Sequence, residues 1–159
     1  MLLKGSCHCG SVRFSVRTRT PVPYMACYCS ICRKTAGGGG FAINIMGEAA
    51  SLKVEGRAHV GVYRARLSPR ARTRSPGRRH FCTRCASALW VADPRWPENV
   101  YPFASAIDTP LPRPRHREHI MLDSKPDWVV PAVRAGDRRF RGYPDEGILD
   151  WHRRHRKLA

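Results

Sequence analysis

The chain has 159 residues, of which 42% are apolar, and this is enough for one domain with a modest core. No basic segment followed by an apolar run opens the sequence, and no apolar run approaches the roughly 18 residues that a membrane-spanning helix needs. The formal net charge of +17 suggests nucleic acid as a partner, but the basic residues are mostly dispersed arginines, so we favour a GC-rich genome as the cause.

Short strand patterns separated by turn residues run through the chain, and no long helical period occurs. Apolar and polar side chains alternate at 11–17, which is typical of a half-buried strand. One short helical turn is expected at 30–35, where a run of four glycines at 37–40 ends it. These spacings predict an all-β domain. Further strand patterns lie at 41–46, 60–67, 80–82, 88–91, 99–104 and 119–122.

Arginine is dense in two places, and we expect both to be solvated. The first is a loop with Ser68-Pro69 and Ser75-Pro76-Gly77 as its turn signals. The second is the C-terminal tail, where 147–155 predicts a short basic helix or, alternatively, a frayed surface segment. Between them, 127–130 is expected to pack an aromatic ring against the sheet. The basic residues concerned are Arg70, Arg72, Arg74, Arg78 and Arg79 in the loop and Arg153, Arg154, Arg156 and Lys157 in the tail.

Seven cysteines are the main chemical signal of the sequence. An odd number, at CxC and CxxC spacings, is typical of metal binding in a reducing compartment and not of a disulfide framework. We therefore expect a cytoplasmic protein without a membrane segment. The cysteines form three groups, at Cys7 and Cys9, at Cys27, Cys29 and Cys32, and at Cys82 and Cys85.

The two pairs of cysteines can together close one zinc site. Zinc takes four thiolates at tetrahedral geometry and is often held by two short turns that are distant in sequence. Such a site carries a net charge of −2 and is a poor Lewis acid, so we interpret it as structural. It would tie the first turn to the second half of a small β domain. Its ligands would be Cys7, Cys9, Cys82 and Cys85.

The three remaining cysteines can hold a second zinc ion and leave its fourth position open, as catalytic sites do. Arg33 and Lys34 follow directly and could bind an anionic ligand, or they could form a solvated basic turn. A fourth ligand that closes the site is the alternative, whereas the spacing does not match the usual iron–sulfur patterns. The open site would consist of Cys27, Cys29 and Cys32, and a closing ligand would be His8, His59, His80 or His119.

Several motifs together resemble the glutathione-dependent formaldehyde-activating enzyme family, which also includes a centromere-associated branch. The resemblance covers roughly residues 2–130. Two positions depart from the family's usual pattern, since Tyr28 stands in place of histidine and Ala86 in place of glycine. The motifs are the CxCG at 7–10, the CxCxxCRK at 27–34, the FCxxC at 81–85, Ala106-Ile107-Asp108 and the late Trp128.

This resemblance implies an Mss4-like or β-tent fold over residues 2–130, followed by a basic C-terminal extension at 131–159. It implies the same division into a structural and a catalytic zinc, hence two zinc ions per chain. The implied activity is the condensation of glutathione with formaldehyde to S-hydroxymethylglutathione, formally a carbon–sulfur lyase reaction in reverse. A zinc-stapled binding module without catalysis, with nucleic acid as a candidate partner, is the alternative function.

Overall fold

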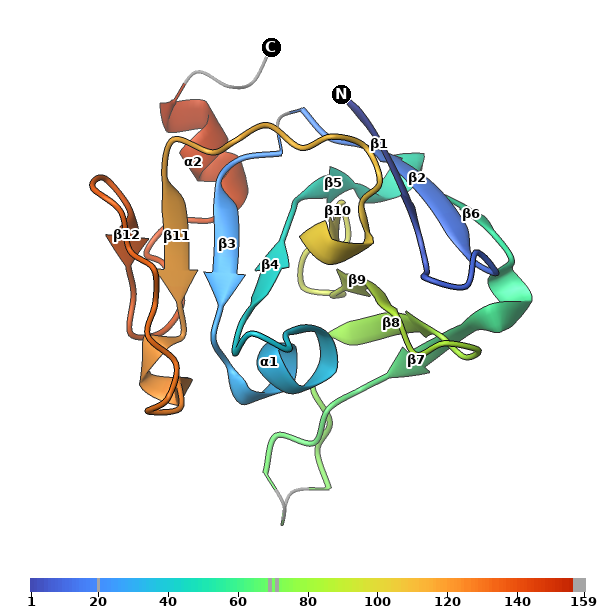
Figure 1. Cartoon of the computed structure of the whole chain (residues 1–159), viewed down its shortest axis with the longest axis horizontal. Helices are drawn as coiled ribbons and strands as arrows, with labels where there is room; N and C mark the ends of the chain where they lie inside the picture. Colours follow the sequence, from blue (N-terminus) through green and yellow to red (C-terminus); the bar gives the residue numbers. More distant parts are fainter. Residues whose placement is uncertain (20, 69, 71, 156–159) are drawn as a thin grey trace.

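The computed structural model describes residues 1–19, 21–68, 70 and 72–155. Most of the regular secondary structure in this part of the chain lies in three β-sheets, and its two α-helices are short (Figure 1). The prediction of an all-β domain is therefore confirmed. No helix in the described ranges is long and apolar enough to cross a membrane.

The first sheet packs the N-terminal strands over the main core. Its strand order is β1, β2, β6, and both pairings are antiparallel. The alternation predicted at 11–17 is confirmed in β2, where Phe14 and Val16 are buried and the flanking arginines are exposed. The strands are β1 Leu2–Ser6, β2 Arg13–Arg17 and β6 Lys53–Glu55.

The second sheet has five antiparallel strands in the order β5, β10, β9, β8, β7. Trp90 of β9 is buried and meets Phe14 of the first sheet edge to face, with ring centroids 5.4 Å apart. This contact joins the two sheets across the core. The strands are β5 Gly47–Glu48, β7 Val60–Tyr63, β8 Arg78–Cys82, β9 Ala88–Ala92 and β10 Asn99–Pro102.

The third sheet has the order β12, β11, β3, β4, and it delivers the chain to helix α1. Strand β3 runs parallel to β11 and antiparallel to β4, and α1 follows β3 after two residues (Figure 1). The helical turn predicted at 30–35 is confirmed. The elements are β3 Tyr24–Cys27, α1 Ser30–Ala36, β4 Ala42–Asn44, β11 Arg117–Ile120 and β12 Arg138–Arg139.

The C-terminal segment folds back onto the third sheet. Strand β12 pairs with β11, and helix α2, Ile148–Arg154, buries Trp151 and His152. The His152 Nε2 lies 2.6 Å from the Val22 carbonyl oxygen, which fixes the helix to the start of β3. The short helix expected at 147–155 is confirmed, while Arg156 and Lys157 lie outside the described residues.

Two predictions from the sequence were wrong, one on the extent of the arginine-rich loop and one on the packing of Trp128. Arg78 and Arg79 belong to strand β8, because the antiparallel pairing with β7 and β9 begins before the cysteine turn. Trp128 is 68% exposed, and its neighbour Val129 is the residue buried against the sheet. Pro69, one of the predicted turn residues, lies outside the described residues. Among the residues that the structure describes there are also four 3₁₀ turns, at Ala49–Ser51, Arg57–His59, Ala104–Ala106 and Leu122–Ser124.

Candidate metal centres and the adjoining pocket

The structure brings the two cysteine pairs together into a four-cysteine centre. Their sulfur atoms all lie within 4.8 Å of one another, and Cys9 Sγ is 3.5 Å from Cys7 Sγ and 3.8 Å from Cys82 Sγ. A tetrahedral zinc ion with bonds of about 2.3 Å places its sulfurs about 3.8 Å apart. The arrangement therefore fits one zinc ion. The four residues are Cys7, Cys9, Cys82 and Cys85.

The two turns that carry these cysteines share one backbone conformation and one hydrogen bond. Gly10 and Ala86 both adopt a positive φ, at 72° and 60°. Each donates its N–H to the carbonyl of the first cysteine of its turn, at 3.0 Å for Gly10 and 2.8 Å for Ala86. The family's usual glycine at position 86 therefore has a conformational reason, and alanine adopts a left-handed backbone there.

The surroundings of the four-cysteine centre favour thiolates at its exposed side. The Ser87 hydroxyl lies 3.2 Å from Cys85 Sγ, and this hydrogen bond, with backbone N–H groups, lowers the pKa of Cys85 to about 5. Burial instead raises the pKa of Cys7 to about 11. The Val12 N–H still donates to Cys7 Sγ at 3.2 Å, which would stabilise a metal-bound thiolate.

The second centre lies where strand β3 passes into helix α1. Cys27 ends the strand, Cys29 is the N-cap of the helix, and Cys32 is in its first turn. Their sulfur atoms lie within 4.8 Å of one another, and the Cys32 N–H donates to Cys29 Sγ at 3.3 Å. Cys27 and Cys32 are buried, while Cys29 is partly exposed. Hydrogen bonds from Cys27 and Cys32 lower the pKa of Cys29.

Within the described residues, no histidine or carboxylate joins the three-cysteine centre. His119 has both ring nitrogens occupied, by the Tyr28 hydroxyl at 2.9 Å and by Asp137 Oδ2 at 3.2 Å. The ring of His80 is stacked on Trp90, with centroids 4.9 Å apart. Among the described residues, none of the four candidate closing ligands, His8, His59, His80 and His119, is grouped with the three sulfurs.

Tyr28, between two ligands of this centre, faces away from the sulfurs. Its side chain is 1% exposed and packs with Phe41 and Val129, whereas Cys27 packs in a different cluster. Adjacent residues in extended backbone point to opposite sides, which explains the separation. The departure from the family's usual histidine at this position therefore affects packing beneath the site.

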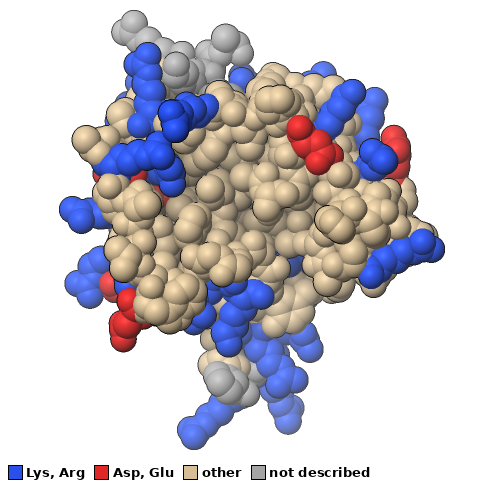
Figure 2. All heavy atoms as spheres, viewed as in Figure 1, with Lys and Arg blue, Asp and Glu red and all other residues tan. Residues whose placement is uncertain are grey.

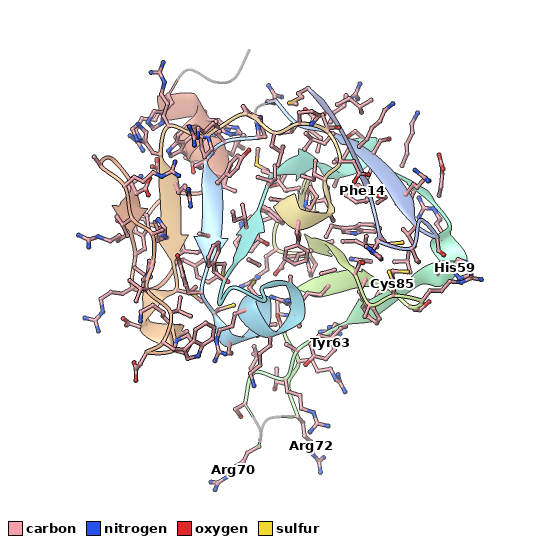
Figure 3. The ribbon with its side chains drawn as sticks, viewed as in Figure 1. Phe14, His59, Tyr63, Arg70, Arg72 and Cys85 are labelled. Atoms are coloured by element: carbon pink, nitrogen blue, oxygen red, sulfur yellow. The ribbon has the colours of Figure 1, made fainter. Side chains whose placement is uncertain are left out.

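An open pocket of about 320 Å³ is lined by none of the three cysteines, but two of its lining residues contact their surroundings. Phe103 lines it and also packs in the cluster that contains Cys27 and Cys32. Arg79 lines it too, and its Nη2 lies 3.8 Å from Cys32 Sγ. Tyr63, another lining residue, stands at the base of the arginine-rich loop near α1 (Figure 3).

Sequence reasoning proposed Arg33 and Lys34 as substrate-binding residues and missed Arg79. Both proposed residues lie in α1, Arg33 partly buried and Lys34 exposed, and neither lines the pocket, although their neighbour Thr35 does. Their role stays a prediction. Arg79 is separated from Cys32 by 47 positions. Its only sequence signal was its place just before the FCxxC motif.

This fold and these sites define a small β domain with two cysteine clusters, one of four and one of three residues, that could each hold a metal ion. The chain belongs to the glutathione-dependent formaldehyde-activating enzyme family, whose model matches residues 2–123.

Two comparisons extend this assignment. A Halomonas elongata protein named "Putative glutathione-dependent formaldehyde-activating enzyme" is 62% identical over 154 residues, which are 97% of this chain and 96% of that protein. A crystal structure of a Rhodobacter sphaeroides protein has a TM-score of 0.54 and 25% identity, over 69% of this chain and 92% of that one.

Proposed function

We propose that the protein is a zinc-dependent enzyme of the carbon–sulfur lyase type that joins a glutathione-like thiol to formaldehyde or another small aldehyde. The family and the name of the 62% identical relative support glutathione and formaldehyde as the substrates. The observation that carries the proposal is the group of three cysteines without a fourth ligand among the described residues, next to an open pocket.

The reaction forms one bond between the thiol sulfur and the aldehyde carbon. The sulfur supplies the electron pair, the carbonyl π pair moves to oxygen, the thiol proton leaves to water, and the oxygen takes up a proton. Zinc bound by Cys27, Cys29 and Cys32 would supply a Lewis acid that favours the thiolate and polarises the aldehyde. Because formaldehyde adds readily to thiols, the protein's own contribution is to hold the partners together.

The residues around the open centre suit this task. The pocket wall includes the apolar residues Phe81, Ala88 and Phe103, which suits a site from which water is partly excluded. Arg33 and Lys34 follow the centre along α1 and remain candidates for binding the carboxylates of a glutathione-like thiol. A second zinc ion at the four-cysteine centre would act only as a structural link.

The proposal is tested by NMR exchange spectroscopy on glutathione and formaldehyde with the zinc-loaded protein. We expect faster adduct formation and breakdown, and we expect Cys29→Ser to abolish the acceleration. Serine is a good N-cap, so this variant retains the cap of α1 while it loses the thiolate ligand. Exchange rates equal to those of the uncatalysed mixture would refute the proposal.

Binding of a polyanion is a second candidate function, favoured by the arginine-rich ribbon between β7 and β8. Residues 64–77 contain five arginines and no acid. The ribbon is held by the Ser75 N–H, which donates to the Ala65 carbonyl at 2.7 Å, and by a bridge between Arg66 and Arg74. Arg70 and Arg72 point away from the body of the protein at its far end (Figure 3), and Figure 2 shows basic side chains gathered over this projection.

Nucleic-acid titrations at several salt concentrations test this second function. Phosphate contacts release counterions, so an interaction through the ribbon must weaken as salt rises, with a slope that falls by about one when Arg72→Ala removes one contact. Undetectable or salt-independent binding to both DNA and RNA would eliminate it.

A further inference from the structure

Arg79 contacts a sulfur of the open centre, and most of its guanidinium is withdrawn from water. Its Nη2 lies 3.8 Å from Cys32 Sγ, while Nε and Nη1 are buried and have no hydrogen-bond partner among the described residues. A buried donor without a partner is rare in proteins, and a buried charge is costly unless an anion pairs with it. The position of Arg79 therefore requires an anion beside it.

The carboxylates nearby do not supply that anion. Within the described residues, no Asp or Glu oxygen lies within 4.0 Å of the Arg79 guanidinium. Hydrogen bonds from Arg95 and, to a smaller extent, the charge of Arg79 lower the pKa of Asp93. The Asp93 carboxylate is paired with Arg95, with Nε to Oδ1 at 3.0 Å and Nη2 to Oδ2 at 2.8 Å. Among the described residues, the group in contact with Arg79 that would become an anion on binding a metal is the Cys32 sulfur.

The net charge of the open centre indicates what the contact between Arg79 and Cys32 does. Three thiolates around a divalent ion carry a net charge of −1, and a thiol that binds there as its thiolate adds another negative charge. Without a nearby cation, the substrate thiolate is repelled by the three cysteine thiolates. Arg79 faces both Cys32 and the pocket, so an anion that enters through the pocket next to Cys32 meets the guanidinium.

We propose that Arg79 is the residue that binds the thiol substrate as its thiolate, by compensating negative charge at the centre formed by Cys27, Cys29 and Cys32. This rests on the proposed function and names the part of the substrate that is recognised, the sulfur and not the carboxylates. Arg78, the preceding residue of β8, is exposed and on the other face of the strand, so it has no such role.

The experiment loads the full-length protein with Co²⁺ and follows the sulfur-to-cobalt absorption band while a thiol is added. Two probes are used, glutathione and 2-mercaptoethanol, which has no carboxylate. We expect Arg79→Met to weaken binding of both thiols by about tenfold to a hundredfold, the usual effect of losing a residue that supports a metal ligand. Arg78→Met makes the same change on the exposed face and should leave both affinities within about twofold.

Two further variants separate charge from folding. Arg79→Lys retains the positive charge and should recover most of the thiol affinity, whereas Arg79→Gln should behave like Arg79→Met. The cobalt band of the four-cysteine centre reports in each variant that the fold is intact, and a variant that lacks this band is replaced by the other neutral variant.

Unchanged affinity in the neutral variants would overturn the proposal, and so would a loss confined to glutathione, because that pattern means carboxylate recognition. Failure of Arg79→Lys to recover binding would overturn it as well. The proposed catalytic function is tested separately, since wild-type protein that binds both thiols without accelerating adduct formation refutes the function and leaves the role of Arg79 standing.

Discussion

Replacing Tyr28 with phenylalanine removes one hydroxyl from a buried chain of hydrogen bonds. The Tyr28 hydroxyl lies 2.9 Å from His119 Nδ1, and His119 Nε2 lies 3.2 Å from Asp137 Oδ2. Asp137 in turn accepts the N–H groups of Arg117 at 2.8 Å and Arg134 at 2.9 Å. These hydrogen bonds link the end of β3 to β11 and to the segment before β12.

The cost of this change follows from burial. Tyr28 and His119 are both 1% exposed, so the variant leaves a ring nitrogen that neither protein nor solvent reaches easily. An unsatisfied buried group costs about 1–3 kcal/mol. For a chain of this length each kcal/mol lowers Tm by about 2–4 °C, so we expect a decrease of about 2–12 °C. The rings of Phe41 and His119 remain in contact with position 28, which limits the loss to the hydrogen bond.

Thermal unfolding of zinc-loaded protein measures the decrease, and Tyr143→Phe is the matched control, because Tyr143 is 61% exposed as a residue. Thiol affinity should change by less than about twofold in Tyr28→Phe, because this side chain lies on the other side of the strand from the sulfurs. A variant that unfolds at the wild-type temperature but loses thiol binding would refute this reasoning and place the Tyr28 hydroxyl in the site.

Three other variants test backbone and pH effects. Ala86→Gly should be neutral or up to about 1 kcal/mol more stable in urea unfolding, because relief of the positive φ of 60° exceeds the added chain entropy; a clear loss would contradict the strain. Gly56→Ala should cost about 2 kcal/mol or more in the same assay, since its φ is +70° and a Cβ would lie 1.9 Å from the Ser11 carbonyl oxygen. For His80, burial lowers the pKa, so the unfolded chain takes up the proton first and stability falls as pH decreases below about 6.5. His80→Phe, which can still stack on Trp90, should flatten the Tm decrease between pH 7 and 5 relative to wild type at saturating zinc; parallel profiles would contradict this sign.

The cysteine pattern made the two centres predictable, because ligand spacing is a local property of the chain. The division into four and three followed from charge and number alone, and the structure groups the sulfurs in the same way. Strand β1 was missed because Leu2–Ser6 has little alternation of its own and is fixed by its pairing with β2. The late strand expected at 119–122 is observed at Arg117–Ile120, a shift that the parallel pairing with β3 decides.

What sequence reasoning could not supply is the direction of side chains across sheets. Trp128 was expected to pack against the sheet, yet the turn closed by the Val129 N–H and the Pro126 carbonyl buries Val129 instead. Arg79 was assigned to a solvated loop because of the turn signals at 68–69 and 75–77, and only the register of β8 against β7 and β9 turns it toward Cys32. Both errors concern contacts between distant segments, which composition and periodicity do not encode.

Strand β8 makes the two centres depend on each other, and this predicts the order in which they fill. Arg79 is its second residue and Cys82 its last, so a metal at Cys82 fixes the strand that presents Arg79 to Cys32. Four thiolates also bind more tightly than three. We therefore expect the first equivalent of Co²⁺ to enter the four-cysteine centre and the second the open centre, giving two successive absorption changes. Cys29→Ser should retain the first change and lose the second; loss of the first change in that variant would contradict the dependence.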